Sequence, residues 1–201
     1  MEFKDRSIVL AVRKFGEKDA ILKCFTQNHG VYSGLIKNAF SKKNNSILQK
    51  GNIVNIHWKA RLEEHLGSFS LEIEEHIASY FFHDHLKIII LDSLCSTTEI
   101  LLAERDSHYH LYEICEKFLL YLKHNLQLSY LEIIKQYILY ELELLKELGY
   151  GLDITKCVAT GKSDDLIYIS PKSAKAVSRD AGLAYNHLLL PLPSFFKENE
   201  I

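Results

Sequence analysis

The side chains that could bind a metal ion are few and scattered along this chain of 201 residues. Two His-x-His pairs, His83 with His85 and His108 with His110, are the first candidates. Each pair lies at the predicted start of a helix, where side chains two positions apart point to different faces. No further histidine or carboxylate has an evident ligand spacing, so we expect buried or capping histidines here rather than a metal site.

A second candidate is the lone cysteine Cys157, in the glycine- and aspartate-rich segment 149–173. A metal knuckle needs a second cysteine two or three residues away, and the sequence has none there. Nucleophilic catalysis is not indicated either, because there is no G-x-S-x-G elbow and no cysteine beside a histidine in a cationic context. The Gly-Lys-Ser at 161–163 lacks the earlier glycine of a P-loop, whose position is taken by Lys156. The sequence therefore gives no argument for an enzyme.

Basic side chains are the strongest chemical signal, and they lie in the first third of the chain. Residues 1–61 hold 12 Lys and Arg against 4 Asp and Glu, whereas residues 62–201 hold 12 against 22. This asymmetry predicts that the front of the chain binds a polyanion and the rest binds something else, a chance fluctuation being the plain alternative. The cations expected in turns or on outward strand positions are Lys14, Lys18, Lys37, Lys42, Lys43, Lys50, Lys59 and Arg61. Along one surface they would displace counterions from phosphates, unless they form only a solvated basic face.

Binding of a single nucleic-acid strand would also use aromatic stacking. Phe15, Tyr32 and Phe40 are candidates, although most aromatic residues of a small barrel belong to its core. Trp58 is expected in the core.

The elements that must position these residues change in type near residue 77. Before it, short β-rich runs with glycine-containing turns between them predict a small closed sheet; they cover 7–15, 20–26, 30–39, 51–61 and 67–74. In the fourth run Val54, Ile56 and Trp58 share one face, and Asn55, His57, Lys59 and Arg61 the other.

After it, helical periodicity covers 83–104, 108–125 and 129–151, and 166–178 could be a hairpin. Ser129 and Glu132 form a capping box at the start of the third helix. That helix is apolar on nearly every face, so we expect it to be central in its bundle. The fold class is α+β, and no membrane span or secretory signal is indicated. Four widely separated cysteines are typical of reduced thiols in a cytoplasmic protein.

Two long segments resemble a known family. "VLAVRKFGEKDAILKCFTQNHGVYSGLIKNAFSKKNNSILQKGNIVNI" (9–56) resembles the amino-terminal OB-fold of RecO, the bacterial recombination mediators. "YELELLKELGYGLDITKCVATGKSDDLIYISPKSAKAVSRDAG" and "LLPLPSFF" are similar to their helical domain. The resemblance implies an OB-fold nucleic-acid-binding domain at 1–76, with a five-stranded barrel. It implies a mainly α-helical domain at 77–201, with an irregular insertion at about 152–182 in place of a zinc site.

The resemblance implies a non-catalytic protein that binds single- and double-stranded DNA. Such proteins anneal strands coated with single-strand-binding protein, whose acidic tail they contact, and with RecR they help to load the recombinase. We therefore expect a nucleoid-associated protein of recombinational repair. Its expected DNA-binding residues are Lys14, Lys37, Lys42, Lys43, Lys59 and Arg61. The alternative from another class is a protein-only adaptor, whose basic face recognises an acidic partner.

Two features depart from the family. Many members carry a zinc site of four cysteines where this chain has only Cys157, and one thiolate cannot hold zinc tetrahedrally. We therefore expect no cofactor and a segment that folds without metal. Family chains also usually continue past "LPLPSF" into one more helix, which leaves open whether this sequence is clipped after Ile201.

Overall fold

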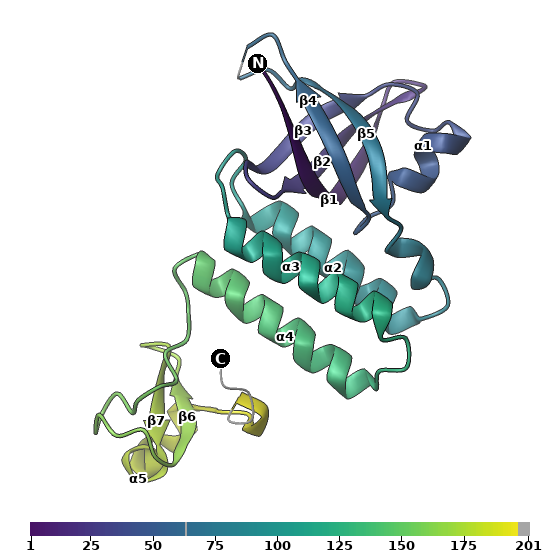
Figure 1. Cartoon of the computed structure of the whole chain (residues 1–201). Coiled ribbons are helices and arrows are strands. Elements are labelled where there is room, and N and C mark those ends of the chain that lie inside the picture. The colour runs from purple at the N-terminus through teal and green to yellow at the C-terminus, as the bar shows by residue number, and fades with distance from the viewer. Residues whose placement is uncertain (63, 197–201) are drawn as a thin grey trace. The chain divides into compact units, whose positions relative to one another are not determined.

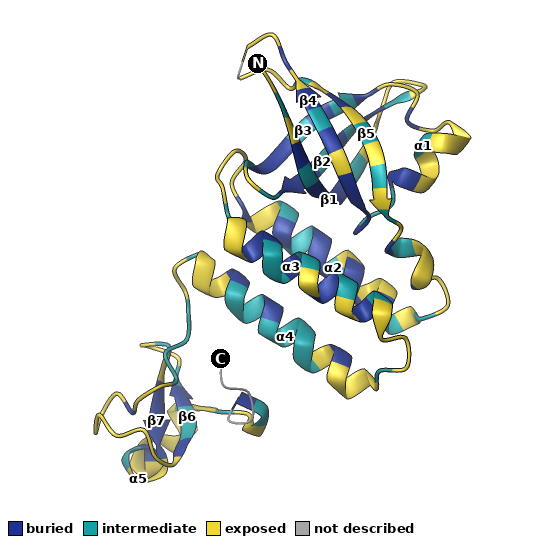
Figure 2. Ribbon diagram, in the orientation of Figure 1, coloured by how far each residue is buried: buried dark blue, intermediate teal, exposed yellow. Residues whose placement is uncertain are grey.

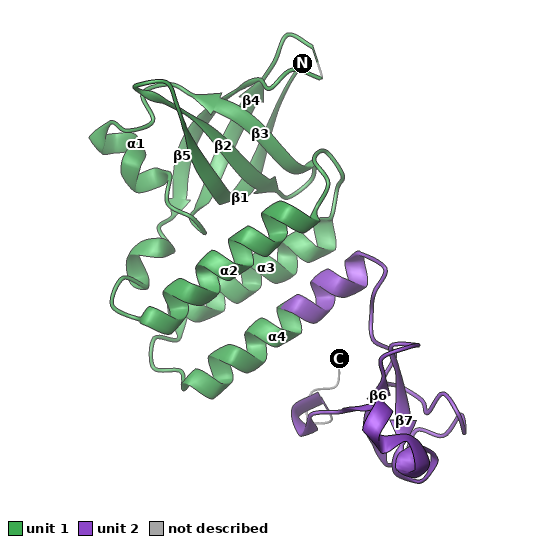
Figure 3. Ribbon diagram, turned by 180° about the vertical axis from the view of Figure 1, so that it is seen from behind, with its two compact units in different colours: residues 1–140 green, residues 141–201 purple. Residues whose placement is uncertain are grey.

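The computed structural model describes residues 1–62 and 64–196. Two compact units divide the chain, Met1–Tyr140 and Glu141–Ile201 (Figure 3), and the boundary falls inside a helix. The end of the sequence, including Ile201, lies outside the described residues.

The first part of the first unit is a barrel. Five strands within the described residues close it, in the order β1-β2-β3-β5-β4 (Figure 1). They are β1 (Glu2–Phe15), β2 (Asp19–Thr26), β3 (Gly30–Ile36), β4 (Ile53–Lys59) and β5 (Ser68–Glu75). Neighbouring strands are antiparallel except β3 and β5, which meet in parallel at Leu35 and Ser68. The predicted α+β class, with an OB-like five-stranded sheet followed by helices, is confirmed.

Strand β4 shows how alternation builds the barrel. Val54, Ile56 and Trp58 are buried, whereas Asn55 and Lys59 are exposed, so one face of the strand forms core and the other faces out (Figure 2). The indole N–H of Trp58 donates to two backbone carbonyl oxygens, each at 3.2 Å. Trp58 is therefore a core residue with a satisfied donor, as its place in the sequence predicts.

Three helices follow the barrel: α2 (His85–Leu101), α3 (Tyr109–His124) and α4 (Tyr130–Glu147). Helices α2 and α3 lie below the barrel in Figure 1, and α2 contacts β1. The ring of Phe25 on β2 packs edge-to-face on Tyr112 of α3, with centroids 5.4 Å apart. Barrel and helices thus share a packed boundary. No helix in the described part of the chain is both long and apolar enough to cross a membrane.

The start of α4 confirms one prediction and contradicts another. Ser129 and Glu132 form the predicted capping box: the Ser129 backbone N–H donates to the Glu132 carboxylate at 2.9 Å. The Glu132 N–H donates back to the Ser129 hydroxyl at 3.3 Å. However, Leu131 is 63% and Ile134 41% exposed, so the expectation of a central helix is wrong for this face. The helix instead contacts α2 on one side, where the Tyr137 hydroxyl lies 2.7 Å from that of Ser93.

The second unit contains a small sheet. Strands β6 (Leu166–Ser170) and β7 (Lys175–Ser178) form the predicted hairpin, and β8 (Leu190–Pro191) pairs with β6. Short helical segments lie between β7 and β8 and after β8: α5 (Arg179–Gly182), η2 (Leu183–Leu188) and η3 (Ser194–Phe196). A small core gathers around Cys157, Leu166 and Ala176.

Candidate nucleic-acid interface

The turn between β1 and β2 brings the ends of three strands together. Lys14 on β1 is opposite Ala20 on β2, and Ala20 is opposite Ile36 at the end of β3. Only three residues, 16–18, connect β1 to β2. Gly16 has a φ of 67° in this turn, a left-handed conformation that glycine adopts without a side-chain penalty. The tight turn places Lys14 and Lys18 beside Lys37, which follows β3.

A short helix continues this surface. The sequence around "SKKNNS" suggests a polar loop, but residues Lys42–Ile47 form a helix, α1. The Ser41 hydroxyl caps it by accepting from the Asn44 N–H at 3.3 Å. The Asn44 side chain donates to the Asn38 carbonyl oxygen at 3.1 Å, and the Asn38 N–H donates to the Asp19 carboxylate at 3.0 Å. These bonds fix α1 against the β1–β2 turn.

The resulting surface, which we name the basic end, carries five exposed lysines: Lys14, Lys18, Lys37, Lys42 and Lys43. No salt bridge joins any of them to a carboxylate within the described residues. Glu17 and Asp19 are the two carboxylates in the same segments. The basic end therefore keeps an excess of positive charge in contact with solvent, and two exposed rings, Phe15 and Phe40, flank its lysines.

On the outer face of β4, in contrast, the basic side chains lie close to a carboxylate. Lys59 is exposed, but its ammonium lies 3.4 Å from the Glu2 carboxylate on β1, and the His57 ring lies 3.4 Å from the same oxygen. The hydrogen bond and charge of Lys59, with the charge of His57, lower the pKa of Glu2. The carboxylate is thus ionised at neutral pH and offsets the charge of Lys59. Arg61 follows the strand, exposed and without a salt bridge to the described residues.

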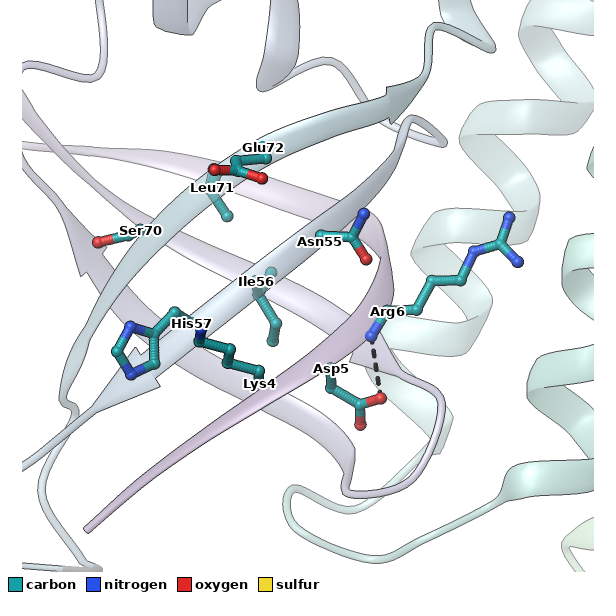
Figure 4. A pocket seen from close by; sticks show the side chains of 9 residues that line it. All are labelled: Lys4, Asp5, Arg6, Asn55, Ile56, His57, Ser70, Leu71 and Glu72. Atoms are coloured by element: carbon teal, nitrogen blue, oxygen red, sulfur yellow. Dashed lines mark hydrogen bonds between the residues drawn. The ribbon is translucent and has the colours of Figure 1, made fainter.

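Beside this face lies an open groove of about 540 Å³, drawn in Figure 4. We name it the strand-four groove; its lining residues are Lys4, Asp5, Arg6, Asn55, Ile56, His57, Ser70, Leu71 and Glu72. The guanidinium of Arg6 lies 2.9 Å from Glu74 and 3.2 Å from Glu116 on α3. Lys4 shares the groove with Glu72. The groove is polar, and Arg6 is paired with two carboxylates, whereas Lys4 has no salt bridge within the described residues.

Several other cations of the barrel pair with the helical region. Arg13 lies 2.5 Å from Glu99, and Lys50 lies 2.5 Å from Asp92, both on α2. Lys23 lies 3.4 Å from Glu104, just after α2. Part of the basic front is therefore neutralised by the acidic rest of the same chain. A composition count cannot reveal this, because the paired positions are far apart in the sequence.

The predicted DNA-binding residues thus divide into two groups. Lys14, Lys37, Lys42 and Lys43 meet at the basic end. Lys59 lies two strands further round the barrel, because it is opposite Ser68 of β5, which is itself opposite Leu35 of β3. Arg61 follows Lys59.

The zinc site that the family resemblance implies for many members does not fit the residues around Cys157. The Cys157 sulfur accepts hydrogen bonds from the Ser178 N–H at 3.3 Å and from the Ser178 hydroxyl at 3.4 Å. Burial raises the pKa of this thiol, but donors on Ser178 and Thr160 outweigh that effect and lower the pKa to about 6. Among residues 1–62 and 64–196 no three His, Cys, Asp or Glu side chains are grouped to hold an ion. The side-chain neighbour of the Cys157 sulfur is thus a serine hydroxyl and not a second metal ligand.

Comparisons with known proteins agree over both halves of the chain. The family model described as "Recombination protein O N terminal" matches residues 1–75, and "Recombination protein O C terminal" matches residues 83–201. A protein of Mesorhizobium japonicum is 40% identical over 197 residues, 98% of this chain and 76% of its own length. One of Rickettsia peacockii is 41% identical over 196 residues, 97% of this chain and 79% of its own. One of Orientia tsutsugamushi is 39% identical over 199 residues, 99% of this chain and 80% of its own. All three are named DNA repair protein RecO.

Proposed function

The chain belongs to the recombination protein O family of DNA repair proteins, and we propose that it binds DNA at the basic end without itself making or breaking a bond. The observation that carries this proposal is selective charge pairing. Several barrel cations have carboxylate partners, whereas Lys14, Lys18, Lys37, Lys42 and Lys43 have no salt bridge within the described residues. Unpaired lysines cost no internal contact when they bind phosphate, and the counterions released from DNA favour association.

In this proposal residues 1–76 form the nucleic-acid-binding domain, and residues 77–201 hold the protein on its partners. Those partners are RecR and the tail of single-strand-binding protein. Lysines between two strands would screen the repulsion between their phosphates, so complementary strands coated with single-strand-binding protein could anneal. The same binding would assist recombinase loading. The protein would act where DNA is, at the nucleoid.

The contributions of the proposed residues are graded by their surroundings. Lys14, Lys37, Lys42 and Lys43 offer their full charge to a phosphate. Lys59 must share its charge with Glu2, because the two groups lie 3.4 Å apart. We therefore expect Lys59 and the neighbouring Arg61 to form the margin of the interface rather than its centre.

The testing experiment replaces two adjacent lysines of α1, K42A/K43A, and measures oligonucleotide binding over a range of salt concentrations. Each lost phosphate contact should reduce the slope of log affinity against log salt by about 0.7 for a single strand. The matched control is K162A/K172A, two exposed lysines of the second unit. An equal loss in both variants, or no loss in K42A/K43A, would contradict the assignment. A protein that binds no oligonucleotide at low salt would favour the protein-only adaptor.

A further inference from the structure

We infer that Phe15 and Phe40 make the basic end selective for unpaired strands, by stacking on exposed bases; this inference rests on the proposed DNA-binding function. The two rings are 54% and 49% exposed, although burial of a phenyl ring is favourable. Neither ring contacts another aromatic ring within the described residues. About half of each side chain is therefore open to a ligand.

Strand pairing and local hydrogen bonds bring the backbone of Phe15 near the segment that carries Phe40. Phe15 is the last residue of β1 and is opposite Asp19. The Asp19 carboxylate accepts from the Asn38 N–H at 3.0 Å, and Phe40 follows two residues later. Asn38 is locked in turn by the Asn44 side chain of α1. The backbone beneath the rings is thus fixed, which lowers the ordering cost of binding.

Tyr32, the third aromatic candidate from the sequence, cannot serve in the same way. It is 9% exposed, and its ring packs edge-to-face on Trp58 with centroids 5.2 Å apart. It also meets Phe3 at 4.9 Å. Tyr32 belongs to the barrel core, so of the three candidates only Phe15 and Phe40 remain accessible.

Lysines and rings recognise different parts of a polynucleotide. Lysines contact phosphates, which single strands and duplexes both present. A phenyl ring stacks on a base face, and in a duplex those faces are covered by neighbouring base pairs. The basic end should therefore bind a single strand through both kinds of contact and a duplex through phosphates alone. When two bound strands pair, the stacking contacts are lost, so the product of annealing binds more weakly than its components.

The experiment uses three fluorescent probes of equal length: an oligothymidylate, an oligomer with phosphates but no bases, and a blunt duplex. F15A/F40A should lose affinity for oligothymidylate by about tenfold for each ring, in line with alanine substitutions at stacked bases. Its affinity for the base-free oligomer and for the duplex should stay unchanged, and so should its salt slope. F15W/F40W should retain the preference for oligothymidylate, whereas F15L/F40L, which keeps apolar bulk, should not.

The control is Tyr130→Ala, which removes another exposed ring, 65% accessible, at the start of α4. It should change binding of none of the probes. In F40W, stacking should quench indole fluorescence, while the native Trp58 is 2% exposed and should respond little. If F15A/F40A loses affinity equally for all three probes, or for none, the inference is wrong while the proposed function stands. If the wild type binds no probe, the proposed function itself is contradicted.

Discussion

The basic end and the strand-four groove are two surfaces of one barrel, and both carry lysine and asparagine side chains. They differ in where the carboxylates lie. At the groove, Arg6 pairs with Glu74 and Glu116, although Lys4 has no salt bridge within the described residues. On the same outer face of β4, Lys59 pairs with Glu2. At the basic end, the Asp19 carboxylate accepts a backbone N–H instead, and no described salt bridge forms with a lysine. Cations that are already paired add little to the binding of a polyanion.

This difference shows that the basic residues have two roles, which a count of charges does not distinguish. Some basic residues form salt bridges that join the barrel to the helices. Lysines that remain unpaired are available to a ligand. The number of cations on a small barrel is therefore a poor measure of its affinity for DNA, and the positions of the facing carboxylates decide it.

The largest expected effect compares the two surfaces directly. Replacing Lys14, Lys37, Lys42 and Lys43 by alanine should reduce affinity for a single strand at low salt by roughly a hundredfold or more, because four phosphate contacts are lost. The variant K59A, beside the strand-four groove, should lose far less, because the exposed Lys59 is already paired with Glu2. Fluorescence anisotropy with one labelled oligonucleotide measures both variants. Similar losses would show that the two surfaces do not differ in function.

A second prediction concerns the groove as a structural feature. Arg6→Ala should lower the free energy of unfolding by about 2 kcal/mol, because Glu116 is only 14% exposed and loses its cationic partner. DNA affinity of the folded variant should stay within about twofold of wild type. Denaturant titration and anisotropy give the two quantities. Arg61→Ala is the matched control, since the exposed Arg61 has no salt bridge to the described residues, and its stability should not change. Loss of DNA binding without loss of stability in Arg6→Ala would make the groove part of the interface.

The smallest expected effect is a gain in affinity for single-stranded DNA. Glu2→Gln removes the carboxylate that Lys59 and His57 share, so both side chains become available to phosphate. Single-strand affinity should rise by a few fold, and the salt slope should steepen by about 0.7, the contribution of one added contact. A salt titration of Glu2→Gln beside K59A tests this. An unchanged slope would mean that Lys59 lies outside the path of the DNA even when it is unpaired.

Much of the fold follows from local patterns in the sequence. The alternation around Trp58 predicts β4 with the correct inward face, and the capping box predicts the start of α4. The elements whose structure differs from the prediction are those that depend on contacts with residues far away in the sequence. Helix α1 forms from a polar segment because Ser41 caps it and Asn44 ties it to the preceding turn. The exposure of Leu131 depends on which elements cover α4, and periodicity does not contain that information.

The candidate site could be predicted only in part for the same reason. The sequence places Lys14, Lys42 and Lys43 in turns or polar segments, and strand register then brings them together. The pairing of Lys59 with Glu2 has one local signal: both residues lie at strand ends. Which ends meet is fixed by the closure of β1 on β4, with Glu2 opposite Lys59, and closure is a property of the whole barrel.

The ion pairs that join barrel to helices have a practical consequence for dissecting this molecule. A fragment ending near residue 76 would lack Asp92, Glu99, Glu104 and Glu116, so Lys50, Arg13, Lys23 and Arg6 would each lose a counter-charge. Such a fragment would carry more unpaired positive charge than the same residues do in the intact chain. Its apparent affinity for nucleic acid would overestimate that of the intact chain. The binding surface mapped on it would include cations that the helical region neutralises in the intact chain.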